Sequence, residues 1–201
     1  MFQPLNASNF EAALRRFDHE NSQDPNIQLV DGQALPRELA YARWLTDWVL
    51  KLAPDASEPL RLAARCQPLC RWLVPRQSYP MTRAGYLQWR EGLKKFHAEK
   101  AGEILREIGY PEDIIGRVQA LNLKKNLFKD SETQVLEDAL CLVFLEHQFS
   151  ELADKTAEDK MINAVQKTWA KMSLTAREIA KTLSYPEREK ALLEQALQAK
   201  A

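Results

Sequence analysis

Apolar residues recur in this chain at the spacing of one face of an α-helix, and this periodicity constrains the fold more than any other feature. The clearest stripe consists of Tyr41, Leu45, Trp48, Val49 and Leu52, all on one side of a helix. No run of β-branched residues alternates with period two, and no internal repeat is present. The sequence therefore predicts an all-α fold of roughly eight or nine helices.

Caps and helix breakers divide the chain into segments. The expected helices cover about 36–53, 57–73, 82–108, 111–121, 131–153, 161–172, 175–183 and 186–200. Pro68 should break the second helix near Gln67, because proline removes a backbone hydrogen bond and clashes with the preceding turn. Leu73 is expected to face the core. Gly109 and Asp130 suit a C-terminal and an N-terminal cap, respectively.

Composition indicates one globular domain. With 201 residues, 45% of them hydrophobic, the chain can bury a sizeable core. We expect a single domain over residues 1–201, with a core of about 8–173 and helices at 175–200 packed on it. The formal net charge of zero argues against a protein that mainly holds long nucleic acid, which requires a large positive field.

The cysteines and the hydropathy pattern indicate in which cellular compartment the protein is expected. Cys66, Cys70 and Cys141 have neither disulfide-framework nor zinc-finger spacing, so we expect reduced, buried thiols and no metal or cofactor. The longest apolar run, Ala139–Leu145, is far shorter than a membrane span. No signal-peptide pattern is visible. These features predict a cytoplasmic protein without a membrane partner.

Glu137 and Asp138 abut this apolar run and are the first candidate site residues. A carboxylate on an apolar helix face requires a cation, a metal or several hydrogen-bond donors. One hypothesis gives the pair a role in acid–base chemistry. The alternative is a carboxylate at a helix start that faces solvent or forms a structural ion pair.

His97 is the candidate imidazole. It lies in a polar helix segment with Glu99 and Glu103, and no second ligand at helical spacing completes a metal motif. The alternative to a catalytic role is a surface or capping histidine. No nucleophile elbow, phosphate loop or dinucleotide fingerprint occurs.

Arginines and aromatic residues cluster between Arg71 and Arg90. The cluster contains Arg71, Trp72, Arg76, Tyr79, Arg83, Tyr86, Trp89 and Arg90. Guanidinium groups beside aromatic rings can hold a phosphate, a carboxylate or a nucleobase. Alternatively, these arginines pair with glutamates and cover the rings with their aliphatic stems. Lys124 and Lys125 could add positive charge to the same site, or be solvated.

Several short motifs resemble one uncharacterised family. They are Ala63-Ala-Arg-Cys-Gln67, Arg71-Trp72, Pro75-Arg76, Tyr79-Pro80, Gly85-Tyr86, Trp89-Arg90, His97, Gln134–Asp138, Cys141–Glu146 and Lys167–Ser173. Together they resemble the domain of unknown function 4202 family over residues 17–173. That family commonly has histidine where this chain has Pro68, so any role of that histidine is absent here.

The helix order is also similar to that of the HD-type phosphohydrolases, which collect metals with histidines and aspartates from separate helices. This resemblance implies an HD-like scaffold and cleft. Tyr41 falls where the first histidine would be and Gln67-Pro68 falls on the His-Asp pair, whereas Asp138 alone keeps its ligand type. The resemblance thus implies that Gln67, His97 and Asp138 meet around a common cleft, whereas the residues themselves argue against its metal chemistry.

The leading hypothesis is that a small anionic ligand, a nucleotide or a phosphorylated metabolite, binds in a metal-free HD-like cleft. Arg71, Arg76 and Arg90 would hold the anion, with Gln67, Lys124 and Lys125 as further contacts. His97 with Glu137 or Asp138 would orient it, or exchange protons if there is turnover. The alternatives are a noncatalytic protein- or RNA-interaction module that uses the Arg/Trp face, and a metal-dependent phosphohydrolase with atypical ligands. The sequence leaves turnover and oligomeric state open.

Overall fold

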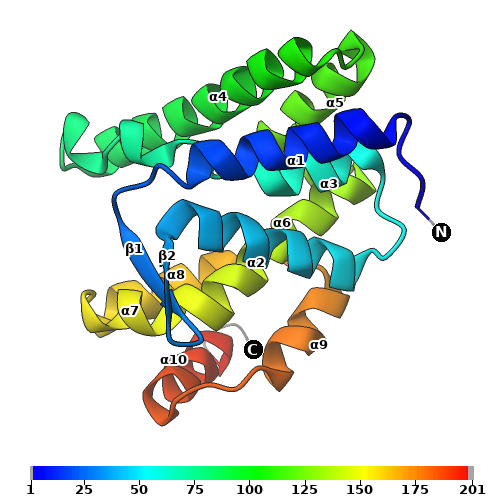
Figure 1. Ribbon diagram of the computed structural model, residues 1–201. Helices are drawn as coiled ribbons and strands as arrows, with labels where there is room; N and C mark the ends of the chain where they lie inside the picture. Colours follow the sequence, from blue (N-terminus) through cyan, green and yellow to red (C-terminus); the bar gives the residue numbers. More distant parts are fainter. Residues whose placement is uncertain (1, 199–201) are drawn as a thin grey trace. The chain divides into compact units, whose positions relative to one another are not determined.

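The computed structural model describes residues 2–198, and almost all of its regular structure is helical (Figure 1). The helices are α1 Ala7–Asn21, α2 Arg37–Leu52, α3 Glu58–Cys66, α4 Arg83–Ile108, α5 Glu112–Asn122, α6 Ser131–Val143, α7 Phe149–Asp154, α8 Glu158–Trp169, α9 Leu174–Thr182 and α10 Glu187–Gln198. The all-α prediction is confirmed, with ten α-helices in the described part of the chain. The chain divides after Leu127 into two compact units, which are described one at a time.

A short hairpin precedes α2 and departs from the expectation of no strands. Strands β1 Ile27–Val30 and β2 Gln33–Pro36 pair antiparallel, with Val30 opposite Gln33. The turn residues Asp31 and Gly32 have φ of 49° and 78°, and an Asp-Gly pair with positive φ matches the twist of a two-residue hairpin turn. Turn chemistry, rather than alternating hydrophobicity, therefore specifies this ribbon.

The predicted break at Pro68 is confirmed in the first unit. Helix α3 ends at Cys66 with Gln67 as its C-cap, and a 3-10 turn, η1, follows at Arg71–Leu73. Leu73 was predicted to face the core, and this is wrong, because its side chain is 62% exposed. Since the helix has already ended, the periodicity of α3 no longer decides where Leu73 points.

Local capping sets both ends of the long helix α4. The Thr82 hydroxyl accepts a hydrogen bond from the Gly85 N–H at 3.1 Å, and Gly109 ends the helix with φ of 93°. Glycine adopts this left-handed conformation without steric cost. Helix α4 packs against α5 and α1. The core of this unit includes Phe17, Leu45, Leu60, Leu62, Leu69, Ile104, Leu105, Ile115 and Leu121.

The second unit begins with the apolar helix α6, whose cap was predicted correctly. Asp130 accepts the Thr133 N–H at 2.8 Å. One helix to Ala153 was expected, but a π-helical segment at Phe144–Gln148 separates α6 from α7. Helix α10 packs against α8 and α7, and α6 packs against α9.

Two further expectations concern the thiols and the membrane. Cys66, Cys70 and Cys141 are free and buried, as predicted. Across residues 2–198, no helix combines the length and apolar character required to cross a bilayer.

Candidate anion-binding site

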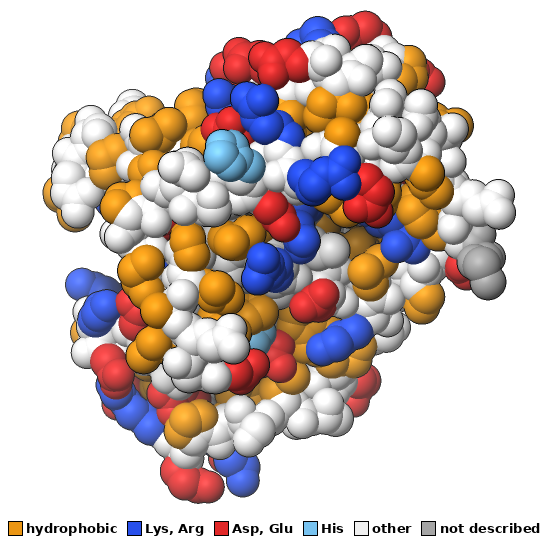
Figure 2. Space-filling view, viewed as in Figure 1, with side chains coloured by type: hydrophobic (Ala, Val, Ile, Leu, Met, Phe, Trp, Pro, Cys, Tyr) orange, Lys and Arg blue, Asp and Glu red, His pale blue; other side chains and the backbone are white. Residues whose placement is uncertain are grey.

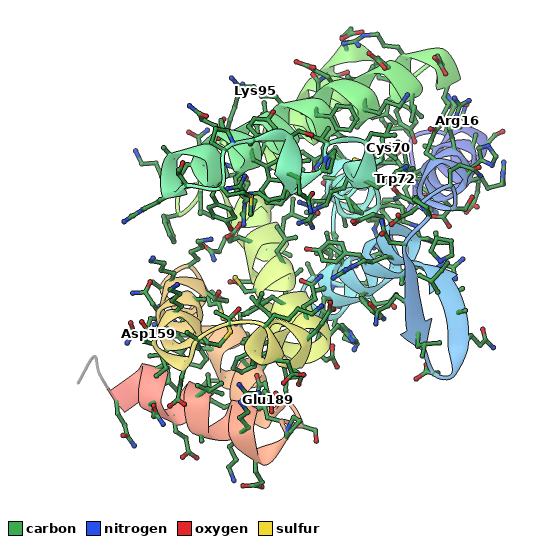
Figure 3. All side chains as sticks on the ribbon, turned by 90° about the vertical axis from the view of Figure 1, so that its left-hand side faces the viewer. Arg16, Cys70, Trp72, Lys95, Asp159 and Glu189 are labelled. Atoms are coloured by element: carbon green, nitrogen blue, oxygen red, sulfur yellow. The ribbon has the colours of Figure 1, made fainter. Side chains whose placement is uncertain are left out.

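The turn between α3 and α4 positions the predicted arginine cluster. Cys70 adopts a left-handed conformation with φ of 54°, which is uncommon for a residue with a side chain. Its N–H donates to Oδ1 of the buried Asn21 on α1 at 3.2 Å, and this bond helps to hold the turn. Cys70 and Trp72 mark the segment in Figure 3. Arg71 lies between them in the chain, at the start of η1.

Arg71 stacks on a fixed aromatic ring. Its guanidinium carbon lies 5.4 Å from the centroid of the Trp89 ring. Trp89 is buried, and its indole N–H donates to the Val74 carbonyl at 2.9 Å. Because this bond and the burial fix the indole, Arg71 has a rigid surface against which to lie. The Arg71 side chain remains half-buried.

His97 lies in the middle of α4 and is only 5% exposed. Burial, together with the nearby charge of Arg71, lowers the pKa of His97 from 6.5 to about 3. The imidazole is therefore neutral over the physiological range. Its Nε2 is buried and has no hydrogen-bond partner among the described residues. A buried polar atom without a partner is costly, and in native proteins it requires an explanation.

Glu38, on the first turn of α2, is a third group in the electrostatic field of Arg71. Burial raises the pKa of Glu38 to about 7, with Arg71 and Arg37 opposing the rise and Asp24 adding to it. The N-cap residue of α2, Pro36, makes no side-chain capping hydrogen bond. The Asp24 carboxylate instead accepts the Glu38 N–H at 3.0 Å. Glu38 thus lies close to the midpoint of its titration at neutral pH.

Arg76 and Arg90 come together around Tyr86. The two guanidinium carbons lie 6.0 and 5.9 Å from the Tyr86 ring centroid, and Arg90 donates to the Tyr86 hydroxyl at 3.1 Å. Arg76 also donates to the carbonyls of Tyr79, Pro80 and Thr82 at 3.0, 2.7 and 3.2 Å. These bonds close the loop before α4, so most donors of Arg76 are already used.

The other predicted contacts of this unit lie along its turns. Gln67 is half-buried at the end of α3. Lys124 has φ of 55° and follows α5. Lys125 lines a surface hollow of about 270 Å³ with Lys95, Glu99 and Gln119. The predicted ligand contacts are therefore distributed between the Arg71 turn and this hollow on α4 and α5.

Glu137 and Asp138 belong to the second unit, and both are buried. Glu137 pairs with Lys171 at 3.3 Å. Asp138 Oδ1 accepts the Ser173 N–H at 2.8 Å and the Gln134 side-chain amide at 2.9 Å. The same amide donates to the Lys171 carbonyl at 2.8 Å. These bonds tie α6 to the start of α9, which is an architectural role for Asp138.

Residues 2–198 contain no group of three or more His, Cys, Asp and Glu side chains that could hold a metal ion. They do contain two further buried atoms without hydrogen-bond partners beside the Arg71 turn. These are Nδ2 of Asn21, whose Oδ1 holds Cys70, and Oδ1 of Asn122, whose Nδ2 donates to the Cys66 sulfur at 3.1 Å. Asn21 and Asn122 thus each combine one bonded and one unbonded polar atom in the interior of this unit.

Sequence reasoning did not identify Glu38 as a site residue. A signal was available, because Glu38 lies three residues before Tyr41 and seven before Leu45, and so falls on their apolar stripe. His97 similarly lies four residues from both Leu93 and Ala101, which are buried. A charged or polar residue on a buried stripe marks a site worth testing.

Fold and site together define an α-helical protein whose first unit carries two buried titratable groups, Glu38 and His97, that both lie in the field of the half-buried Arg71. The family model described as domain of unknown function (DUF4202) matches residues 11–193, and the chain belongs to this family. Comparison with curated proteins and with solved structures gave no match. The HD-like arrangement therefore stays a prediction.

Proposed function

We propose that this protein binds a small anionic ligand, a nucleotide or a phosphorylated metabolite, at Arg71. The observation that carries the proposal is the buried Nε2 of His97, which has no partner and lies in the field of the Arg71 guanidinium. An anion held by Arg71 would bring acceptor oxygens to this imidazole. Arginine suits this role because its fork of donors matches phosphate and carboxylate geometry.

Charge also supports this position for a ligand. No Asp or Glu occurs between Pro59 and Arg90, a stretch that contains six arginines. Arg61 and Arg65 of this stretch are engaged, Arg61 by the carbonyls of Ala56 and Pro54 and Arg65 by Asp18. The Arg71 guanidinium lies over the Trp89 ring, and among the carboxylates its charge acts on the buried Glu38. An anionic ligand would complete the charge balance there.

His97 acts in this proposal as a neutral hydrogen-bonding group. With a pKa of about 3, its imidazole does not take up the second ring proton near neutral pH in the free protein. An anion beside it would raise that pKa, because opposite charge favours the imidazolium form. Glu38 opposes ligand binding when it is ionised, because its negative charge repels the anion. Binding should therefore weaken as the pH rises through about 7.

The test is a thermal-shift and calorimetric screen of nucleotides, sugar phosphates and inorganic sulfate, whose charge is constant across this pH range. A ligand that binds the folded state raises its stability by mass action. We expect at least one probe to bind, and Arg71→Gln to weaken it about tenfold or more. Arg15→Gln is the control, because Arg15 is an exposed arginine of the same unit. Failure of every probe, or equal binding to Arg71→Gln, contradicts the proposal.

A further inference from the structure

Exposed apolar side chains concentrate beside the arginines of the first unit. Of the large hydrophobic residues that are exposed in the described chain, Leu73, Met81, Tyr86 and Leu87 fall within fifteen residues of one another. Met81 is 75% and Leu87 is 57% exposed. Figure 2 shows hydrophobic side chains gathered over the end of α4 at which the helix begins. Exposed apolar side chains that gather in this way are candidates for an interaction surface.

Arginines border these apolar residues along α4. Arg83, Leu87 and Arg90 lie at i, i+4 and i+7, and therefore on one helical face. We call Met81, Arg83, Leu87 and Arg90 the arginine–leucine face. Elsewhere in the first unit, arginines pair with carboxylates, as in Arg65–Asp18 and Arg106–Glu112.

Arg83 and Arg90 differ from these paired arginines. No acidic side chain among residues 2–198 forms an ion pair with either of them. A face with two guanidinium groups outside any ion pair and with exposed Met and Leu is complementary to a surface that is both acidic and apolar.

We propose that the arginine–leucine face docks an acidic amphipathic helix of a partner protein. Leu87 and Met81 would receive its apolar side chains, and Arg83 and Arg90 would pair with its carboxylates. An amphipathic helix presents apolar anchors at i, i+3, i+4 and i+7, which fits the helical spacing of this face. The surface does not include Arg71, so the proposal is independent of the ligand site.

The aromatic residues argue against RNA as the occupant. Single-stranded RNA is held largely by bases that stack on open aromatic rings. Here Arg76 and Arg90 both lie against the Tyr86 ring. Trp89 is buried beneath Arg71. With these rings occupied, aliphatic and charged groups remain to make contact, and they suit a protein helix.

The experiment is an unbiased selection from a random peptide library of about four helical turns per peptide, with the full chain as bait. We expect enriched peptides to combine Asp or Glu with apolar residues at helical spacing. Arg83→Glu and Leu87→Ser should each weaken the selected peptides about tenfold or more. The matched controls, Arg15→Glu and Leu29→Ser, change an exposed arginine of α1 and an exposed leucine of the hairpin and should bind as the unaltered chain does.

Three outcomes overturn the proposal. The first is a selection that enriches no peptide, or enriches peptides without acidic residues. The second is binding that Arg83→Glu and Leu87→Ser leave unchanged. The third is binding of a uridine oligonucleotide that Arg83→Glu abolishes while Leu87→Ser does not, because this result would make the face a nucleic-acid surface. Circular dichroism of each variant confirms that the helical fold is retained.

Discussion

The guanidinium of Arg71 lies over the indole ring of Trp89, with its carbon 5.4 Å from the ring centroid. Trp89 is fixed by its hydrogen bond to the Val74 carbonyl. The stack links the η1 turn to α4, the helix that also carries His97. The position of the proposed ligand site therefore depends on a side chain that would not contact the ligand.

Replacing Trp89 tests this dependence. Trp89→Phe keeps an aromatic ring but removes the indole N–H, leaving the Val74 carbonyl without this donor, so the free energy of unfolding should fall by about 1–3 kcal/mol. Ligand affinity should fall as well, because Arg71 loses part of its support. Urea unfolding and calorimetry measure the two effects. Loss of stability with unchanged affinity would show that the stack does not position Arg71.

Replacing Arg76 should mainly lower stability, whereas replacing Arg71 should mainly lower ligand affinity. Arg76 donates to three loop carbonyls, so Arg76→Gln should destabilise the fold by about 1–2 kcal/mol and leave ligand affinity nearly unchanged. Arg71→Gln should do the reverse. Urea unfolding and ligand titration of both variants measure these two effects. Equal loss of affinity in the two variants would contradict the prediction and would place the anion between these arginines.

Glu38 and His97 should give opposing pH dependences of stability. The pKa of Glu38 is raised from 4.5 to about 7, so the folded state binds this proton more tightly, and the stability contributed by Glu38 falls as pH rises through that window. The pKa of His97 is lowered from 6.5 to about 3, so its contribution is lost as pH falls below 6.5. Between about 4.5 and 6.5 the two effects offset each other.

Replacing Glu38 or His97 singly should reveal how each residue contributes to the pH dependence of stability. Relative to the unaltered chain, Glu38→Gln should gain stability as pH rises from 4.5 to 7, by up to about 3 kcal/mol. His97→Gln should instead gain relative stability as pH falls below 6.5. Urea melts across this range measure both. A Glu38→Gln curve parallel to that of the unaltered protein would mean that the carboxyl titrates normally.

Asp138 should prove architectural. Asp138→Ala leaves the Ser173 N–H without its acceptor and the Gln134 amide with the Lys171 carbonyl alone, which should cost about 2–4 kcal/mol. Asp138→Asn retains an acceptor oxygen and should cost about 1 kcal/mol or less. Glu178→Ala, which removes an exposed carboxylate of the same unit, should change stability by about 0.5 kcal/mol or less. Equal losses for Asp138→Ala and Glu178→Ala in urea melts would rule out this role.

Much of the helical framework could be predicted because its signals are local. The left-handed Gly109 and the cap at Asp130 each depend on neighbouring residues only, and the structure contains both. Leu73 was misplaced because its orientation depends on where α3 ends. The Asp31-Gly32 turn was also a local signal, but the strands that it joins have four residues each, too few for a clear alternation.

The candidate site was harder to predict because burial and partners arise from tertiary packing. The cluster from Arg71 to Arg90 was recognised, yet nothing in the sequence distinguishes Arg76, whose donors close a loop, from Arg71, whose charge acts on His97. Glu38 resembled an ordinary acidic residue in a first helical turn. Its raised pKa results from burial by other elements and from Asp24.

The most direct test of the central claim is nitrogen NMR of the His97 imidazole during titration with inorganic sulfate and with the nucleotide or sugar phosphate that binds best. His19→Gln and His147→Gln variants assign the signals, since the chain has three histidines. We predict a neutral His97 at neutral pH whose Nε2 resonance shifts in step with ligand saturation and no longer does so in Arg71→Gln. A His97 that titrates near its ordinary pKa of 6.5, or an Nε2 resonance that stays constant while the ligand saturates the protein, would contradict the account.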